Sequence, residues 1–268
     1  MGMLMFDIIL PISSLFDDNK NTDRLKKLCD GYETRHRSEN STLENQLFFH
    51  ADDIQPIHEM SDNDFIFLEK ISKTKKDLKY VSFHCASNCK YPLIKDGIFE
   101  LGSNSIVYNR EKLYSNAEKN FKIIKRILGD SITVMIENNN FYPTTAYKDI
   151  CDPRFITDIV NDNEIYFLFD NAHAEVSAFN MKINYEEYKK NLPMQKIKQI
   201  QFCKPYIPEI NNGNIARDIH ELPDEKIIKE VLELIKNYNV KYITPEYYKN
   251  IDKLENFLLN LNKKKNNN

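Results

Sequence analysis

The sequence predicts an α/β protein whose parallel strands close into a TIM-type (β/α) barrel. Short apolar runs alternate with longer amphipathic stretches almost from end to end, a pattern typical of a parallel sheet covered by helices. The length of 268 residues suits one barrel, and no stretch has the composition of a linker between domains. Potential ligands stand at the ends of the apolar runs, and in a barrel those ends meet at one mouth. Periodicity alone also allows an open, doubly wound sheet.

Seven apolar runs rich in β-branched or aromatic residues are predicted to be strands, namely 5–10, 46–50, 78–84, 131–137, 164–170, 197–202 and 240–246. The predicted helices are 22–29, 57–73, 110–128, 152–160, 185–191 and 225–238. Asp152 and Asp224 stand where helix N-caps are expected, and Gly129 ends the longest helix. An eighth strand is expected to be short, irregular or missing, with residues 97–107 or 214–219 as its place.

We expect residues 1–261 to form a single barrel domain, because neither an internal repeat nor a linker marks a second one. The last residues, 262–268, read NKKKNNN and are of low complexity. The sequence therefore predicts a disordered basic, Asn-rich tail there.

Composition and cysteine usage favour a cytoplasmic protein. The net charge of −3 gives no broad attraction to nucleic acid or to an anionic membrane. No run approaches the roughly 20 apolar residues of a membrane span, and the N-terminus lacks the basic start of a signal peptide. Five scattered cysteines fit reduced thiols better than a disulfide framework. Nucleic acid and membrane are therefore not expected as partners.

Polar residues with metal-binding side chains close most of the predicted strands. These residues are His50, His84, Glu137, Asp170 followed by His173, Gln201 and Glu246, and a further pair, Asp218 and His220, stands in a loop. Several carboxylates in one barrel mouth would repel each other unless a cation lay between them. Mixed histidine and carboxylate ligation suits iron, manganese or zinc better than calcium. The sequence therefore predicts a shared metal site, although each of these residues alone would be read as a loop residue or a helix cap.

The segment 170–180, DNAHAEVSAFN, resembles the strand-end motif of the multinuclear non-heme iron-dependent oxidases, a family of the xylose-isomerase-like TIM-barrel superfamily. The order of the other motifs is similar too: SFHC with His84, MIENNN with Glu137 and Asn138, an Asp-x-His pair, and a glutamate after the last strand. The resemblance extends from His84 to Glu246, and DNAHAEVSA is its most specific part.

This resemblance implies an oxidoreductase of natural product biosynthesis that binds two or three iron ions. It would use dioxygen as co-substrate to oxidise a cysteine of a ribosomally made precursor peptide, which a partner protein presents. The implied metal ligands are His50, His84, Glu137, Asp170, His173, Asp218, His220 and Glu246. Glu137, Asp170 and His173 would form the catalytic centre, with Asn138 and Gln201 as further site residues. Where the family usually has a ligating histidine, the sequence reads QIQFCKP with Gln201, which leaves the metal count open.

Other functions remain compatible with the same residues. A sugar isomerase or epimerase would use one divalent metal to polarise a carbonyl while a carboxylate moves a proton. A metal-dependent endonuclease would need a basic groove, which the near-neutral charge does not favour. A metal-free binding module on the same barrel is a further alternative, and Gln201 is the feature in its favour.

Overall fold

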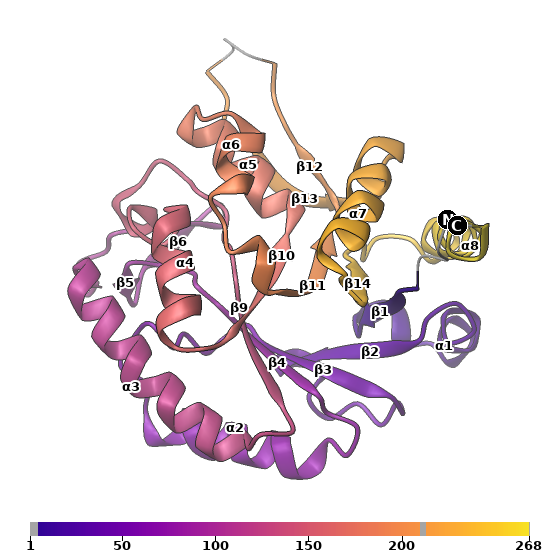
Figure 1. Cartoon of the computed structure of the whole chain (residues 1–268), viewed down its shortest axis with the longest axis horizontal. Helices are drawn as coiled ribbons and strands as arrows, with labels where there is room; N and C mark the ends of the chain where they lie inside the picture. Colours follow the sequence, from indigo (N-terminus) through magenta and orange to yellow (C-terminus); the bar gives the residue numbers. More distant parts are fainter. Residues whose placement is uncertain (1–4, 210–212, 268) are drawn as a thin grey trace.

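The computed structural model describes residues 5–209 and 213–267, and its centre is a closed barrel of parallel strands (Figure 1). Around the barrel the strands follow the order β1, β2, β3, β4, β9, β10, β11 and β14, and β14 pairs with β1 to close it. Their bounds are Asp7–Pro11, Gly31–Arg35, Gln46–Ala51, Tyr80–His84, Thr133–Glu137, Tyr166–Asp170, Ile197–Phe202 and Tyr242–Pro245. The TIM-type fold class predicted from the sequence is confirmed.

Helices form a ring outside the barrel (Figure 1). They are α1 Asn19–Leu25, α2 Asp62–Thr74, α3 Arg110–Leu128, α4 Pro153–Asp162, α5 Asn171–Met181, α6 Tyr185–Lys190, α7 Glu225–Tyr238 and α8 Ile251–Asn267. The predicted end signals are confirmed, because Asp152 and Asp224 cap α4 and α7 through their side chains and Gly129 ends α3 with a φ of 72°. None of the helices in the described part of the chain has the length and apolar character that crossing a membrane requires.

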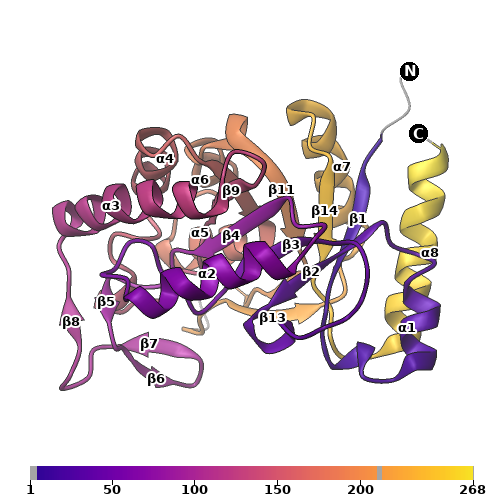
Figure 2. The same cartoon turned by 90° about the horizontal axis from the view of Figure 1, so that it is seen from below.

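Short elements decorate the loops between strands and helices. Three antiparallel pairs lie outside the barrel: β5 Cys89–Lys90 with β8 Ile106–Val107, β6 Leu93–Lys95 with β7 Ile98–Glu100, and β12 Lys204–Tyr206 with β13 Arg217–Glu221. Figure 2 shows β6, β7 and β13 on the same side of the molecule. Short 3-10 helices span Ser14–Phe16, His36–Ser38, Thr145–Tyr147 and Met194–Lys196.

The eighth barrel strand is β2, so the expectation that it lay at 97–107 or 214–219, or was missing, is wrong. Those two segments hold β7, β8 and β13, which pair outside the barrel. The strand β2 reads GYETR and has no apolar run, although all five of its residues are buried. Its charged residues Glu33 and Arg35 are buried because they pair with each other at 3.0 Å. From the sequence alone, two charged residues in such a segment are expected to be exposed, because their pairing inside the barrel cannot be seen.

Two helices were not predicted. The helix α5 is buried on nearly all sides, so it lacks the alternation of apolar and polar faces by which a surface helix is recognised. The helix α8 continues to Asn267 and so includes most of the segment 262–268 for which a disordered tail was predicted; residue 268 lies outside the described residues. It lies beside α1, where Arg24 pairs with Asp252 and Glu255.

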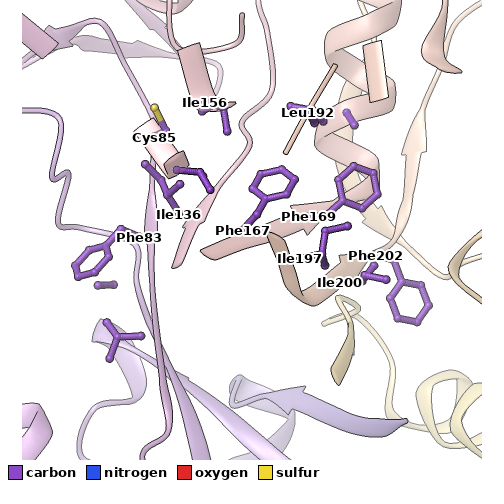
Figure 3. Close-up of a cluster of buried hydrophobic side chains, with 14 of the residues drawn as sticks. Phe83, Cys85, Ile136, Ile156, Phe167, Phe169, Leu192, Ile197, Ile200 and Phe202 are labelled. Carbon is purple, nitrogen blue, oxygen red and sulfur yellow. The ribbon is translucent and has the colours of Figure 1, made fainter. Parts of the chain in front are cut away.

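The hydrophobic core has an outer and an inner layer. In the outer layer, side chains such as Phe167 and Phe169 of β10 point away from the barrel toward α4 and the segment around Leu192 (Figure 3). The inner layer fills the barrel with residues from alternate positions of its strands: Ile9, Phe48, Met135, Leu168 and Tyr242.

Along each strand, the next inward positions toward the carboxyl end are polar. Phe48 is followed two residues later by His50, Met135 by Glu137, and Leu168 by Asp170. Because side chains two residues apart point to the same face of a strand, the barrel interior changes from apolar to polar at its mouth.

Candidate metal centre

The eight residues predicted as metal ligands lie around this one mouth. His50, His84, Glu137 and Asp170 are on β3, β4, β9 and β10, and Glu246 directly follows β14. His173 is in the first turn of α5, and Asp218 and His220 are on β13. The structure therefore brings together residues that are up to 196 positions apart in the chain, and three groups can be distinguished among them by distance.

The first group is formed by His50, His84 and Glu137. Oε2 of Glu137 lies 3.3 Å from Nε2 of His50 and 3.0 Å from Nε2 of His84. The two imidazole rings meet edge to face, with centroids 4.5 Å apart. These three residues offer ligand atoms that all lie within 4.8 Å of one another.

The second group is formed by Glu137, Asp170 and His173, again with ligand atoms within 4.8 Å of one another. The other oxygen of Glu137, Oε1, lies 2.9 Å from Nδ1 of His173. Oδ1 of Asp170 caps α5 by accepting a hydrogen bond from the backbone N–H of His173 at 2.7 Å. Oδ2 of Asp170 is buried and has no hydrogen-bond partner.

The third group is formed by Asp218, His220 and Glu246. Nε2 of His220 lies 3.3 Å from Oδ2 of Asp218 and 3.2 Å from Oε2 of Glu246. Oδ1 of Asp218 accepts from the backbone N–H of His220 and from the thiol of Cys203, so Oδ2 is the oxygen that faces the mouth. Oδ2 also lies 3.4 Å from Nε2 of His173, which connects this group to the second.

These atoms fit metal binding in two respects. Transition metals bind imidazole and carboxylate at about 2.0–2.2 Å, so two atoms on one ion at angles of about 90–110° lie roughly 3.0–3.5 Å apart. The distances of 3.0–3.4 Å from His50 and His84 to Glu137, and between Asp218 and its two histidines, are in this range. Buried Nε2 of His50 and buried Oε2 of Glu137 have no hydrogen-bond partner, which is costly unless a cation binds there.

The histidines are also held as metal-ligating histidines usually are. Nδ1 of His50 lies 2.7 Å from the Ser82 hydroxyl, and Nδ1 of His173 donates to the backbone carbonyl of Asn138 at 2.9 Å. One nitrogen of each ring is therefore fixed by the protein, and Nε2 is directed at the carboxylates.

The pKa values in this cluster are displaced in opposite directions. Burial raises the pKa of Asp170 to about 8, and the charges of Glu246 and Glu137 act in the same sense. Burial and the neighbouring His84 lower the pKa of His50 to about 3. Burial would also lower the pKa of His173, but Asp170 and Glu137 hold it well above its usual value. Several buried carboxylates thus share only a few positively charged partners. Divalent cations bound among them would relieve their mutual repulsion.

The two further predicted residues, Asn138 and Gln201, bind protein groups. The Asn138 side chain donates to the backbone carbonyl of Asp170 and accepts from its N–H, both at 2.9 Å, which aligns the ends of β9 and β10. The Gln201 amide donates to both oxygens of Glu33, at 3.0 and 3.1 Å.

Sequence reasoning missed Glu33 and Arg35 at this mouth. Both are on β2, the strand that was not predicted, and the Arg35 guanidinium also contacts Glu246. The available signal was the spacing of two opposite charges two residues apart between Gly31 and His36, which is compatible with one buried strand face.

A cavity of about 290 Å³ opens over the cluster. Its polar wall includes His84, Glu137, His173, Asp218 and Glu246. The loops that follow the barrel strands also line it, with Gly97, Phe99, Asn139, Asn140, Tyr142 and Tyr147. Ligand atoms and an aromatic, carboxamide-bearing wall therefore face the same space.

Solved structures with the same fold belong to several kinds of protein. The 3-keto-D-glucoside 4-epimerase YcjR from E. coli has a TM-score of 0.65 at 11% identity, covering 96% of this chain and 99% of that one. The IolI protein with a bound zinc atom has a TM-score of 0.63 at 13% identity, covering 97% and 96%. A xylose isomerase domain-containing protein from Salmonella typhimurium has a TM-score of 0.62 at 12% identity, covering 98% of each chain. At these identities the likeness is one of fold, and it confirms the xylose-isomerase-like barrel.

Sequence comparison identifies the family. The UPF0276 protein VP3015 of Vibrio parahaemolyticus is 25% identical over 109 residues, which are 41% of this chain and only 37% of that relative. The family model described as RiPP precursor modification enzyme MbnB/TglH/ChrH matches residues 104–263, more than half of the chain. This range includes five of the predicted ligands at the mouth, from Glu137 to His220, and Glu246 in addition. The chain therefore belongs to the MbnB/TglH/ChrH family of RiPP precursor modification enzymes.

Proposed function

We propose that this enzyme is a multinuclear iron-dependent oxidase that uses dioxygen to modify a cysteine of a ribosomally made precursor peptide. The observation that carries the proposal is the position of Glu137 between two groups of potential ligands. Oε2 of Glu137 faces His50 and His84, and Glu137 also belongs to the group with Asp170 and His173. One carboxylate can thus be shared by two ions, whereas a single-metal epimerase would need only one such group.

The proposed ligands are the eight residues His50, His84, Glu137, Asp170, His173, Asp218, His220 and Glu246. Bound iron would supply the redox chemistry with dioxygen, which no protein side chain can supply by itself. The protein's own part is to fix the ligands before iron binds. Ser82 and the Asn138 carbonyl orient two imidazoles, and the α5 N-terminus orients Asp170.

The part of the cavity lined by these loops is proposed to hold the peptide. Phe99, Tyr142 and Tyr147 offer apolar contact area, and Asn139 and Asn140 stand beside them. A cysteine side chain entering the cavity would reach the ligand cluster while the aromatic rings exclude water from it. The proposal includes a separate protein that presents the peptide. It also includes the organisation of residues 1–261 as one domain.

Metal analysis of protein purified under nitrogen without added metal tests the proposal. Two or three irons per chain, together with dioxygen consumption that requires both the precursor peptide and its cysteines, is the expected result. A peptide in which every cysteine is replaced by serine serves as the matched control. One divalent metal per chain without thiol-dependent dioxygen consumption would instead indicate an epimerase-type enzyme, and absence of metal would indicate a binding module.

A further inference from the structure

The guanidinium of Arg35 lies inside the mouth at the end of β2, where Arg35 pairs in register with His50 of the neighbouring strand β3. Its side chain is only 10% exposed. Nε and Nη2 donate to Oε1 of Glu33 at 3.3 and 3.0 Å, and Nη2 also contacts Oε1 of Glu246. A fixed positive charge therefore stands between two buried carboxylates.

The oxygens around Arg35 are occupied by protein donors. Gln201 donates to both oxygens of Glu33, and Gln199 donates to Oε2 of Glu33 at 2.7 Å. The Tyr248 hydroxyl donates to Oε1 of Glu246 at 2.8 Å. Of the Glu246 carboxylate, Oε2 is the oxygen that faces His220 and the other proposed ligands.

Three other atoms at the mouth have the reverse character. Nε2 of His50, Oε2 of Glu137 and Oδ2 of Asp170 are all buried and have no hydrogen-bond partner. Atoms that need a cation are thus found around Glu137 and Asp170, whereas Glu33 and Glu246 already have a cation in Arg35. The protein itself therefore supplies partners for Glu33 and Glu246, whereas the other three atoms have no partner in it.

We propose that Arg35 takes the place of a metal ion between Glu33 and Glu246, so that the centre holds two ions and not three. Glu33 and Gln201 hold the guanidinium in place, and Glu246 is shared between it and the ions. This inference rests on the proposed metal-dependent function and sets the number of ions in it.

Titration of the chelator-treated protein with Co²⁺ tests the inference without an activity measurement. After gel filtration, elemental analysis should give two Co²⁺ per wild-type chain. Arg35→Met leaves Glu33 and Glu246 without their cation, and a third Co²⁺ per chain is expected there. Arg35→Lys keeps the charge and should stay at two. Arg37→Met, which removes the exposed arginine two positions further on, should also stay at two.

The outcomes separate the two proposals. Three Co²⁺ in the wild type, or an unchanged two or fewer in folded Arg35→Met, would overturn the role of Arg35 while leaving a metal-dependent enzyme. No Co²⁺ in the wild type would overturn the proposed function and the inference with it. If Arg35→Met does not fold, Gln201→His decides: it adds an imidazole but keeps the guanidinium, so two ions support the inference and three contradict it.

Discussion

Asp170 connects the fold to the candidate metal centre through its two carboxylate oxygens. Oδ1 caps α5, and the buried Oδ2 has no partner in the protein. An asparagine can keep the cap while it loses the charge, whereas an alanine loses both. We therefore expect Asp170→Asn to lose at least half of the bound metal with little change in stability. Asp170→Ala should lose the metal and, in addition, about 1 kcal/mol of unfolding free energy.

Elemental analysis and urea denaturation measure the two effects separately. Asp224→Ala is the matched control, because Asp224 caps α7 in the same way but is not among the proposed ligands. It should lose about 1 kcal/mol of stability and no metal. Full metal occupancy in Asp170→Asn would show that the carboxylate has only a structural role.

Glu137 is the residue on which the proposed centre depends most, because both of its oxygens face histidines. We expect Glu137→Gln to lose nearly all metal, since an amide offers a single neutral oxygen where a carboxylate can be shared. Stability measured in excess chelator should fall modestly, because the attraction of His84 and His173 for the carboxylate is lost while the amide oxygen can still accept a hydrogen bond. Elemental analysis and thermal denaturation with chelator check both expectations, and a variant that keeps two ions would contradict them.

At the scale of residues, the sequence predicted the location of those residues whose place depends only on where a strand ends. His84, Glu137 and Asp170 could be placed at one mouth because each ends an apolar run, and parallel strands end on the same side. The pairing of Glu33 with Gln199 and Gln201 could not be predicted in this way. Those partners are 166 and 168 residues away in the chain, and only barrel closure brings them together.

At the scale of elements, the helix α5 connects two of the loops around the mouth through hydrogen bonds. The Asn180 side chain donates to the backbone carbonyls of Phe141 and Ala216 at 2.8 and 3.1 Å and accepts from the Ala216 N–H at 2.8 Å. Through these bonds it connects the loop after β9, which carries Tyr142, to the segment before β13, which carries Asp218 and His220. The positions of the third ligand group therefore depend on a side chain outside the mouth.

We expect Asn180→Ala to lose roughly 2–3 kcal/mol of unfolding free energy, since buried hydrogen bonds contribute about 1 kcal/mol each and unpaired groups cost more. Metal affinity should fall because Asp218 and His220 are no longer fixed. Urea denaturation and a Co²⁺ titration measure these effects, with Asn161→Ala on the exposed side of α4 as the control. Wild-type stability and affinity in Asn180→Ala would show that other contacts hold these loops.

Helices were predictable from the sequence where one of their faces contacts solvent. The bounds of α3 and α7, Arg110–Leu128 and Glu225–Tyr238, agree with the predicted ranges because both helices have an apolar and a polar face. The helix α5 lacks such faces, and β2 lacks an apolar run, since their burial is decided by neighbours distant in sequence. The DNAHAEVSA motif predicted potential ligands at the start of α5 although periodicity did not identify the helix.

At the scale of the whole molecule, the described residues beyond Leu261 are attached to the barrel mainly by contacts of polar and charged side chains. Leu261 is the last buried apolar side chain among the described residues. Beyond it, Lys264 pairs with Glu225 at 2.9 Å and Lys265 with Asp30 at 2.8 Å, in partly exposed positions. Such surface ion pairs contribute about 0–1 kcal/mol each.

Truncation after Leu261 should therefore preserve the fold and lower the unfolding free energy by no more than about 2 kcal/mol. Truncation after Asn250 is the contrasting variant, because it removes the buried side chains of α8 and exposes the side of the barrel beside α1. Thermal denaturation distinguishes them. Loss of cooperative unfolding in the variant truncated after Leu261 would mean that residues 262–268 belong to the domain.

The last prediction concerns the coupling of metal binding to the stability of the whole barrel. The inner and outer core layers contain no proposed ligand, so the barrel should fold in excess chelator. A ligand that binds only the folded state at 100 times its Kd stabilises it by about 2.7 kcal/mol, and two independent ions by about twice that. For a chain of this size, each kcal/mol corresponds to roughly 2–4 °C.

We therefore expect Fe²⁺ under nitrogen, or Co²⁺, to raise the Tm of the wild type by about 10–20 °C. Excess chelator should reverse the shift, and Glu137→Gln should abolish most of it. Ca²⁺ at the same concentration should give a much smaller shift, because it prefers all-oxygen sites and these groups contain imidazole. A wild-type Tm that responds equally to Ca²⁺ and Co²⁺ would mean that the ions bind surface carboxylates and that the histidines at the mouth are not ligands.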